Sequence, residues 1–124
     1  MDERFRPAQR IRRRSDYQKA YREGTRVNGR LMTLYLLPNG LEVGRLGVAA
    51  TRRFGGAVER NRAKRRIREL FRTRQDLVAG FDIVVVPKRG FAEASGADLE
   101  RDYLGALVRA AHRPGPGGRD RAGR

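Results

Sequence analysis

Cysteine is absent from the sequence, histidine occurs once, and no apolar run is longer than a few residues. Without cysteine, disulfides and thiolate metal sites are excluded. The apolar runs, such as residues 83–86, are far too short to span a bilayer. The sequence begins Met-Asp-Glu and lacks the apolar core of a secretory signal peptide. We therefore expect a soluble cytoplasmic protein.

Acidic residues are also few. The 124 residues include 14 Asp and Glu against 29 Lys and Arg, which gives a net charge of +15. Such an excess opposes compaction and predicts a polyanionic partner, for which nucleic acid and an anionic membrane surface both qualify. Hydrophobic residues make up 39% of the chain, enough for one modest core. Length and composition therefore predict a single domain.

The two ends of the chain differ from its middle. Residues 1–14 are polar and basic and are expected to form an extended N-terminal extension. Residues 15–18 (Ser-Asp-Tyr-Gln) have the form of a capping box, which predicts a short helix that ends at Gly24. Residues 113–124, rich in Gly, Pro and Arg, predict a disordered basic tail. The folded domain is expected to span residues 15–112.

The strand pattern indicates a small sheet. Residues 25–29 give a weak strand signal, and residues 31–37 alternate as a strand that closes at Pro38-Asn39-Gly40. Residues 45–51 are the expected hairpin partner of 31–37. Their face of small residues (Gly47, Ala49, Thr51) predicts an open, shallow surface on which Tyr35 stands. Residues 81–87 are apolar on both faces except for Asp82, which is typical of a central strand.

Two further helices are predicted by apolar residues at helical spacing. The first spans residues 57–74 after the Gly55-Gly56 break. Ser95 is expected to cap the second. The residues predicted to face the core are Ala63, Ile67, Leu70 and Phe71 in the first helix, and Leu99, Tyr103, Ala106, Leu107 and Ala110 in the second. The order helix, two or three strands, helix, strand, helix predicts an α/β sandwich.

The helix at 57–74 carries most of the charge. Residues 52–74 contain ten basic and two acidic residues. Arg60, Lys64 and Arg68 fall within an arc of about 80° on that helix. Like charges at i, i+4 destabilise a helix, so a bound polyanion is the natural compensation, although a merely solvated basic face is the alternative. The amides that follow Gly55-Gly56 could bind a phosphate, or the two glycines could simply form a turn.

No protein active site is predicted. A nuclease acting alone needs a general base or clustered metal ligands. His112 lies at the edge of the tail with no obvious partner. Asp98 and Asp102 share a helical face with Glu100 nearby, but acidic residues in a first turn are ordinarily explained by the helix dipole. We therefore assign no catalytic residue and no metal ligand.

Residues 51–68 (Thr-Arg-Arg-Phe-Gly-Gly-Ala-Val-Glu-Arg-Asn-Arg-Ala-Lys-Arg-Arg-Ile-Arg) closely resemble the signature of the bacterial ribonuclease P protein family. The Arg-Asn-Arg motif of that family falls at residues 60–62. The resemblance covers roughly residues 10–112 and includes the spacing of Tyr17 and Tyr21, the Gly24-Thr25 step, Tyr35 and the strand at Gly47.

The resemblance implies a fold that periodicity alone does not give. It is an α/β (α+β) two-layer sandwich of order αβββαβα with a mixed sheet, similar to domain 2 of ribosomal protein S5. In it, a left-handed βαβ crossover joins two parallel strands through the Arg-Asn-Arg helix. Pattern reasoning alone would predict the opposite hand, because about 98% of such connections are right-handed.

The resemblance also implies the function. The family member is an RNA-binding subunit that assists the ribonuclease P catalytic RNA in removing the 5′ leader from precursor tRNA, with hydrolysis by Mg²⁺ bound mainly by the RNA. It implies no membrane partner and no small-molecule substrate. A ribosomal or general nucleic-acid-binding protein is the alternative.

Carried over by position, two sets of site residues follow from the resemblance. Those expected to bind RNA are Arg52, Arg53, Arg60, Asn61, Arg62, Lys64, Arg65 and Arg68. Those expected to line a cleft for the single-stranded leader are Tyr17, Tyr21 and Tyr35. Phenylalanine is common in the family at the first two cleft positions, and tyrosine keeps the stacking face. Without the resemblance, Tyr17 and Tyr21 are interpreted as core residues.

Overall fold

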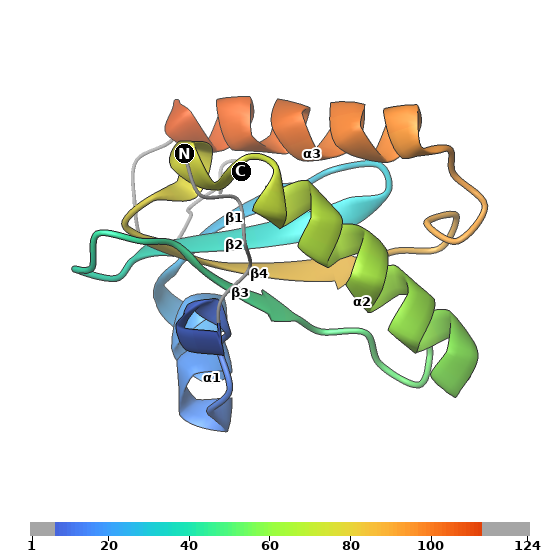
Figure 1. The fold of residues 1–124 in the computed structure, drawn as a ribbon, viewed down its shortest axis with the longest axis horizontal. Helices are drawn as coiled ribbons and strands as arrows, with labels where there is room; N and C mark the ends of the chain where they lie inside the picture. The colour runs from blue at the N-terminus through green and yellow to red at the C-terminus, as the bar shows by residue number, and fades with distance from the viewer. Residues whose placement is uncertain (1–6, 113–124) are drawn as a thin grey trace.

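A four-stranded mixed sheet with helices on both faces forms the protein (Figure 1). The computed structural model describes residues 7–112, so the predicted tail at 113–124 lies outside the described residues. In chain order the elements are the 3₁₀ helix η1 (Pro7–Gln9), α1 (Arg14–Glu23), β1 (Thr25–Asn28), β2 (Met32–Pro38), β3 (Arg45–Val48), α2 (Ala57–Arg72), the 3₁₀ helix η2 (Gln75–Val78), β4 (Phe81–Pro87) and α3 (Gly96–Ala111). None of the described helices is long and apolar enough to cross a membrane.

The strand order is β1-β2-β4-β3. β2 is antiparallel to both β1 and β4, whereas β3 is parallel to β4. The predicted hairpin between residues 31–37 and 45–51 is therefore wrong. β4 lies between the two strands because its side chains are apolar on both faces, and a strand of that kind is stable only in the centre of a sheet. The third strand is also shorter than predicted and ends at Val48.

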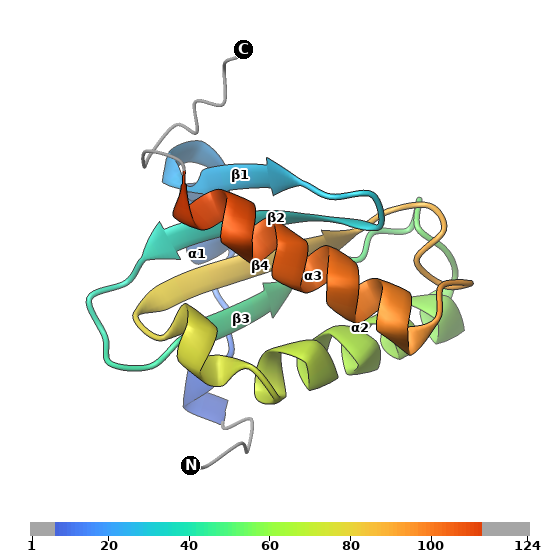
Figure 2. The same cartoon turned by 90° about the horizontal axis from the view of Figure 1, so that it is seen from above.

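The connection from β3 to β4 runs through α2, which lies on the same face of the sheet as α3 (Figure 2). With β3 and β4 adjacent and parallel, this arrangement makes the crossover left-handed, as the family resemblance implies. The two helices and this face enclose the main core. Its largest fully buried members include Met32, Leu34, Ile67, Phe71, Ile83, Val85, Leu99 and Tyr103. The predicted apolar stripes of α2 and α3 are confirmed, and Leu31, just before β2, also joins this core.

Among residues 7–112, the opposite face of the sheet is covered only by α1 and the segment before it. A small second cluster forms there from Ile11, Ala20 and Val84. Tyr17, Tyr35, Ala49 and Val86 pack around it and are only partly buried. This face is thus incompletely covered, in contrast to the main core.

The segment before α1 is not simply extended, as predicted, but docks on the free edge of β3. Arg10 forms a parallel bridge with Leu46, and the Ile11 amide donates to the Leu46 carbonyl at 2.9 Å. Because this docking fixes the chain, α1 begins at Arg14 with Arg13 at the N-cap and no side-chain cap. The predicted capping box at Ser15 is therefore wrong, since Ser15 lies inside the first turn.

Two other predicted boundaries are confirmed, whereas α2 ends at Arg72 rather than at residue 74. α1 ends at Glu23 with Gly24 as its C-cap, where an added Cβ would lie 2.6 Å from the Ala20 carbonyl oxygen and 3.0 Å from the Leu36 carbonyl oxygen of β2, so only glycine fits here. The Ser95 hydroxyl accepts a hydrogen bond from the Asp98 amide at 3.1 Å and caps α3. In β4 the buried Asp82 forms an ion pair with Arg45 at 2.6 Å, which explains the one charge within that strand.

Candidate nucleic-acid interface

Three tyrosines meet on the incompletely covered face of the sheet. Tyr17 and Tyr21 lie one turn apart on α1, and Tyr35 rises from β2. The rings of Tyr21 and Tyr35 are in edge contact, with centroids 4.9 Å apart. Tyr21 is 42% exposed, and the other two are partly buried. The structure therefore brings together the three residues predicted for the leader cleft and leaves part of their ring surface open to a ligand.

Tyr17 covers Gly47 of β3. A Cβ at Gly47 would lie 2.8 Å from two ring carbons of Tyr17, so this contact requires glycine. The surface predicted to be open at Gly47 is thus filled by an aromatic ring. Burial raises the pKa of Tyr17. The hydrogen bond with the Val48 backbone and the charge of Arg68 lower this pKa in part.

A small hollow of about 120 Å³ lies beside Tyr17. Its walls come from the N-terminal segment, α1, β3 and α2, and are formed by Arg10, Ile11, Tyr17, Leu46, Val48, Lys64 and Arg68. Burial lowers the pKa of Arg68, and the neighbouring charges of Arg10 and Arg65 lower it further. Cations held this close repel one another, and a bound phosphate would relieve that repulsion.

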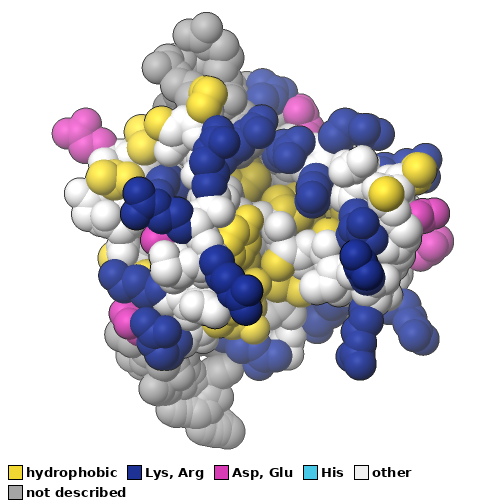
Figure 3. All heavy atoms as spheres, turned by 90° about the horizontal axis from the view of Figure 1, so that it is seen from below, with side chains coloured by type: hydrophobic (Ala, Val, Ile, Leu, Met, Phe, Trp, Pro, Cys, Tyr) yellow, Lys and Arg dark blue, Asp and Glu magenta, His cyan; other side chains and the backbone are white. Residues whose placement is uncertain are grey.

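The predicted basic residues do not form one uniform surface. Lys64 and Arg68 line the hollow, whereas Arg60 donates to the Gly55 carbonyl at 2.9 Å and holds the loop before α2. The predicted residues whose side chains are exposed are Arg52, Arg53, Asn61, Arg62 and Arg65. From the side of α1, an apolar floor is seen with Lys and Arg around it (Figure 3). The basic residues and the tyrosines thus border one surface.

The start of α2 is already close to a negative charge. The Glu59 carboxylate oxygen lies 3.0 Å from where a Gly56 Cβ would be, and an added Cβ at Gly55 would lie 2.9 Å from Glu59 Cβ. A carboxylate in the first turn complements the helix dipole. The two glycines therefore allow close packing against Glu59, which favours the turn over the phosphate site among the two interpretations.

The acidic residues of α3 have structural partners. Asp102 accepts hydrogen bonds from the amides of Arg30 and Leu31, at 3.0 and 2.9 Å, and so ties the β1–β2 connection to α3. Asp98 pairs with Arg101 at 2.8 Å, and Glu100 pairs with Arg74. Within residues 7–112, no three His, Cys, Asp or Glu residues are placed to hold a metal ion. His112 is exposed at the end of α3, with Nδ1 2.9 Å from the Val108 carbonyl oxygen.

The part of the N-terminal segment that lines the hollow was not predicted from the sequence. Arg10 and Ile11 belong to this segment and line the hollow, and Arg10 forms a bridge with Leu46 of β3. The only signal was one isolated apolar residue, Ile11, among arginines, and one residue carries no periodicity.

The fold and the site together define a class of protein. It is a small, strongly basic α+β protein that presents aromatic and cationic side chains on one incompletely covered face. Aromatic rings beside a basic groove are the construction by which proteins bind single-stranded nucleic acid.

Comparison with known proteins gives the family. The family model of ribonuclease P matches residues 5–111. The ribonuclease P protein component of Thermotoga petrophila is 37% identical over 94 residues, covering 75% of this chain and 80% of the relative. That of Dehalococcoides mccartyi strain ATCC BAA-2266 is 40% identical over 92 residues, covering 74% and 76%. The chain therefore belongs to the family of ribonuclease P protein components, which places it in an endoribonuclease complex of tRNA 5′ processing.

Solved structures agree. The RNase P protein of Thermotoga maritima superimposes with a TM-score of 0.73 at 32% identity, covering 81% of this chain and 96% of that protein. A mutant of the Staphylococcus aureus RNase P protein with defective mRNA degradation activity gives a TM-score of 0.77 at 28% identity, covering 84% and 89%. The mixed sheet with three helices is therefore the fold of this family.

Proposed function

We propose that this chain is the RNA-binding subunit that assists a catalytic RNA in removing the 5′ leader from precursor tRNA. The observation that carries this proposal is the position of the three tyrosines, beside the basic hollow of Lys64 and Arg68 and on one face. The chain itself supplies no catalytic residue in this scheme and works in the cytoplasm, where precursor tRNA is processed in bacteria.

The tyrosines are the proposed binding site for the leader. Stacking of a base on an aromatic ring contributes about 1–3 kcal/mol and tolerates any base, which suits leaders that differ between tRNAs. Only a single, flexible strand exposes its base faces for stacking, so mature tRNA lacks the matching element.

The basic residues of α2 and the preceding loop are the proposed contacts to the RNA subunit and to the substrate near the cleavage site. Arg52, Arg53, Asn61, Arg62 and Arg65 are exposed for such contacts. Mg²⁺ bound mainly by the RNA subunit would supply the hydrolytic chemistry. The protein would hold the RNA strands in place by neutralising phosphate charge.

Reconstitution at low Mg²⁺ tests this proposal. Added protein should restore leader cleavage by a bacterial ribonuclease P RNA under conditions in which the RNA alone is inactive, because protein cations replace part of the neutralising Mg²⁺. No stimulation over a wide range of protein concentrations would contradict the proposal and favour a general RNA-binding protein.

A second arm uses protein rigorously freed of RNA. We expect it to cleave neither precursor tRNA nor an mRNA, because the described residues contain no cluster of metal ligands, and the buried carboxylate of Asp82 is paired with Arg45. An mRNA is included as the second RNA in this test because a mutant of the Staphylococcus aureus relative has defective mRNA degradation activity. Turnover by the RNA-free protein that tracks its concentration would overturn the assignment of catalysis to the RNA.

A further inference from the structure

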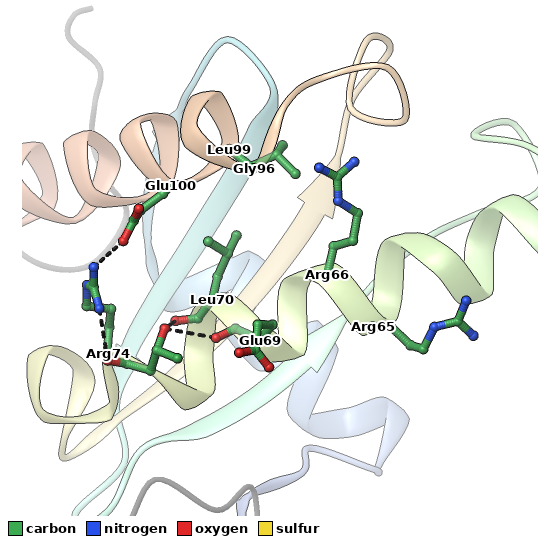
Figure 4. A pocket seen from close by; sticks show the side chains of 9 residues that line it. Arg65, Arg66, Glu69, Leu70, Arg74, Gly96, Leu99 and Glu100 are labelled. Carbon is green, nitrogen blue, oxygen red and sulfur yellow. Dashed lines mark hydrogen bonds and ion pairs between the residues drawn. The ribbon is translucent and has the colours of Figure 1, made fainter.

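A second hollow lies between α2 and α3, away from the tyrosines. It has a volume of about 490 Å³, which is within the range of ligand-binding pockets. α2 and the turn after it contribute Arg65, Arg66, Glu69, Leu70, Thr73 and Arg74, and the start of α3 contributes Gly96, Leu99 and Glu100 (Figure 4). We call this hollow the α2–α3 groove.

The groove and the tyrosine face lie on opposite sides of α2. Lys64 and Arg68 point toward the tyrosine side, where they line the smaller hollow. Arg66 comes two residues after Lys64, and Leu70 two residues after Arg68. Two residues correspond to about 200° around a helix, and Arg66 and Leu70 line the groove. One strand stacked on the tyrosines therefore does not occupy the groove as well.

The walls of the groove combine apolar and charged groups. Leu70 is partly buried, and Leu99 is buried beneath it in the core. Arg66 extends from α2 toward the segment before α3, where its Nη2 donates to the Ala94 carbonyl at 2.8 Å and its guanidinium lies 5.9 Å from the centroid of Phe91 (Figure 4). Arginine has five N–H donors, so a guanidinium held in this way is preorganised to bind a phosphate.

The charged groups are distributed along the groove. Arg65 and Arg66 lie toward one end, and the Glu100–Arg74 ion pair closes the other (Figure 4). A nucleotide has parts that match these groups. It carries a phosphate for arginine, an apolar base face for leucine, and amino groups that donate hydrogen bonds to a carboxylate. A duplex keeps its base faces stacked, so it cannot place a base in a hollow of this size.

We propose that the α2–α3 groove binds one unpaired nucleotide of the catalytic RNA. This proposal rests on the proposed function and adds a second RNA site to it. Arg65 is exposed and belongs to the basic surface of α2 while it also lines the groove, so a strand bound along α2 reaches the groove directly. The leader occupies the tyrosine face, and the groove therefore meets the other RNA.

Gly96 offers a way to fill the groove without disturbing the core. Gly96 lies on the same face of α3 as Leu99 and Tyr103, at spacing i, i+3 and i+7. An added Cβ at Gly96 meets no heavy atom within 4 Å. We choose Gly96→Trp to fill the groove, with Gly96→Leu as a smaller alternative. Ala97→Trp is the matched control, because Ala97 is exposed, adjacent in sequence and not part of the groove.

The measurement is the dissociation constant of each full-length protein for a bacterial ribonuclease P RNA at fixed salt, with circular dichroism to confirm folding. Gly96→Trp should weaken binding roughly 10-fold, the scale of one lost base contact, and Ala97→Trp less than about twofold. The ratio of holoenzyme affinities for precursor and mature tRNA should not change. Equal effects of the two variants, or a loss seen only with leader-bearing substrate, would overturn the proposal.

Cross-linking of the wild-type protein provides a measurement that needs no variant. Catalytic RNA that carries 4-thiouridine should cross-link to the peptides at 65–74 and 96–100, and cross-links confined to other peptides would contradict the proposal. If the wild-type protein fails to stimulate cleavage at low Mg²⁺, the proposed function fails. If it stimulates cleavage but Gly96→Trp binds as Ala97→Trp does, only the groove assignment fails.

Discussion

The two faces of the sheet use apolar side chains in different ways. On the face covered by α2 and α3, side chains such as Leu34 and Val85 are fully buried. On the face covered by α1, the buried apolar cluster consists of Ile11, Ala20 and Val84 among residues 7–112, and the tyrosines keep part of their surface exposed. Apolar surface stabilises the fold only where it is removed from water, and what stays exposed is available to a ligand. The structure thus separates stability from binding.

The largest expected effect is on the fully buried face. Phe71→Ala should lower the free energy of unfolding by about 3–5 kcal/mol, because it removes a buried ring and leaves a cavity. Tyr21→Ala, which truncates a 42% exposed ring on the other face, should cost far less. Urea denaturation of both variants measures the difference, and comparable losses would mean that the two faces are equally important for stability.

Gly47→Ala tests a contact that is expected to affect both stability and RNA binding. Its Cβ would lie 2.8 Å from the Tyr17 ring, so Tyr17 must move away from β3. Overpacking of this kind costs about 1–3 kcal/mol, and displacement of the ring should also weaken binding of precursor tRNA. Gly105→Ala is the control, because its Cβ would meet only the far end of Arg109, at 3.6 Å. Normal stability and normal binding for Gly47→Ala would show that Tyr17 is not held by this contact.

The smallest effect on stability is expected for the basic residues. Arg68→Ala removes a cation whose pKa is lowered by burial and by Arg10 and Arg65, so the free energy of unfolding should change by less than about 0.5 kcal/mol. RNA binding should weaken for both Arg68→Ala and Arg65→Ala. The slope of log K against log salt concentration should become shallower by about 0.7–0.9 for each lost phosphate contact. Unchanged slopes in both variants would assign these residues to a merely solvated face.

Local patterns predicted most of the elements, because each element carries its own signal. The helical spacing of Ala63, Ile67 and Phe71 identified the buried side of α2, and Ser95 marked the start of α3. The family resemblance added the parallel strands and the hand of the crossover, which no local signal contains. It also identified Tyr17, Tyr21 and Tyr35 as a group, whereas periodicity alone assigned Tyr17 and Tyr21 to the core.

The errors concern contacts between distant segments. β3 pairs with β4, which follows it by more than 30 residues, and the turn residues after β2 favoured a local hairpin instead. Docking of Ile11 on Leu46 moved the start of α1 to Arg14. Partners of this kind are selected by burial in the complete fold, so the local sequence does not specify them.

The central claim is that the partly exposed tyrosines bind the leader. The direct measurement is the ratio of the holoenzyme dissociation constants for precursor and mature tRNA at fixed salt, for the wild type, Tyr35→Ala and Tyr35→Phe. Tyr35→Ala should weaken precursor binding by about 1–3 kcal/mol and leave mature tRNA almost unaffected, whereas Tyr35→Phe keeps the stacking face and the wild-type ratio. Equal losses for precursor and mature tRNA, with circular dichroism showing a folded protein, would contradict the leader assignment and make Tyr35 a structural residue.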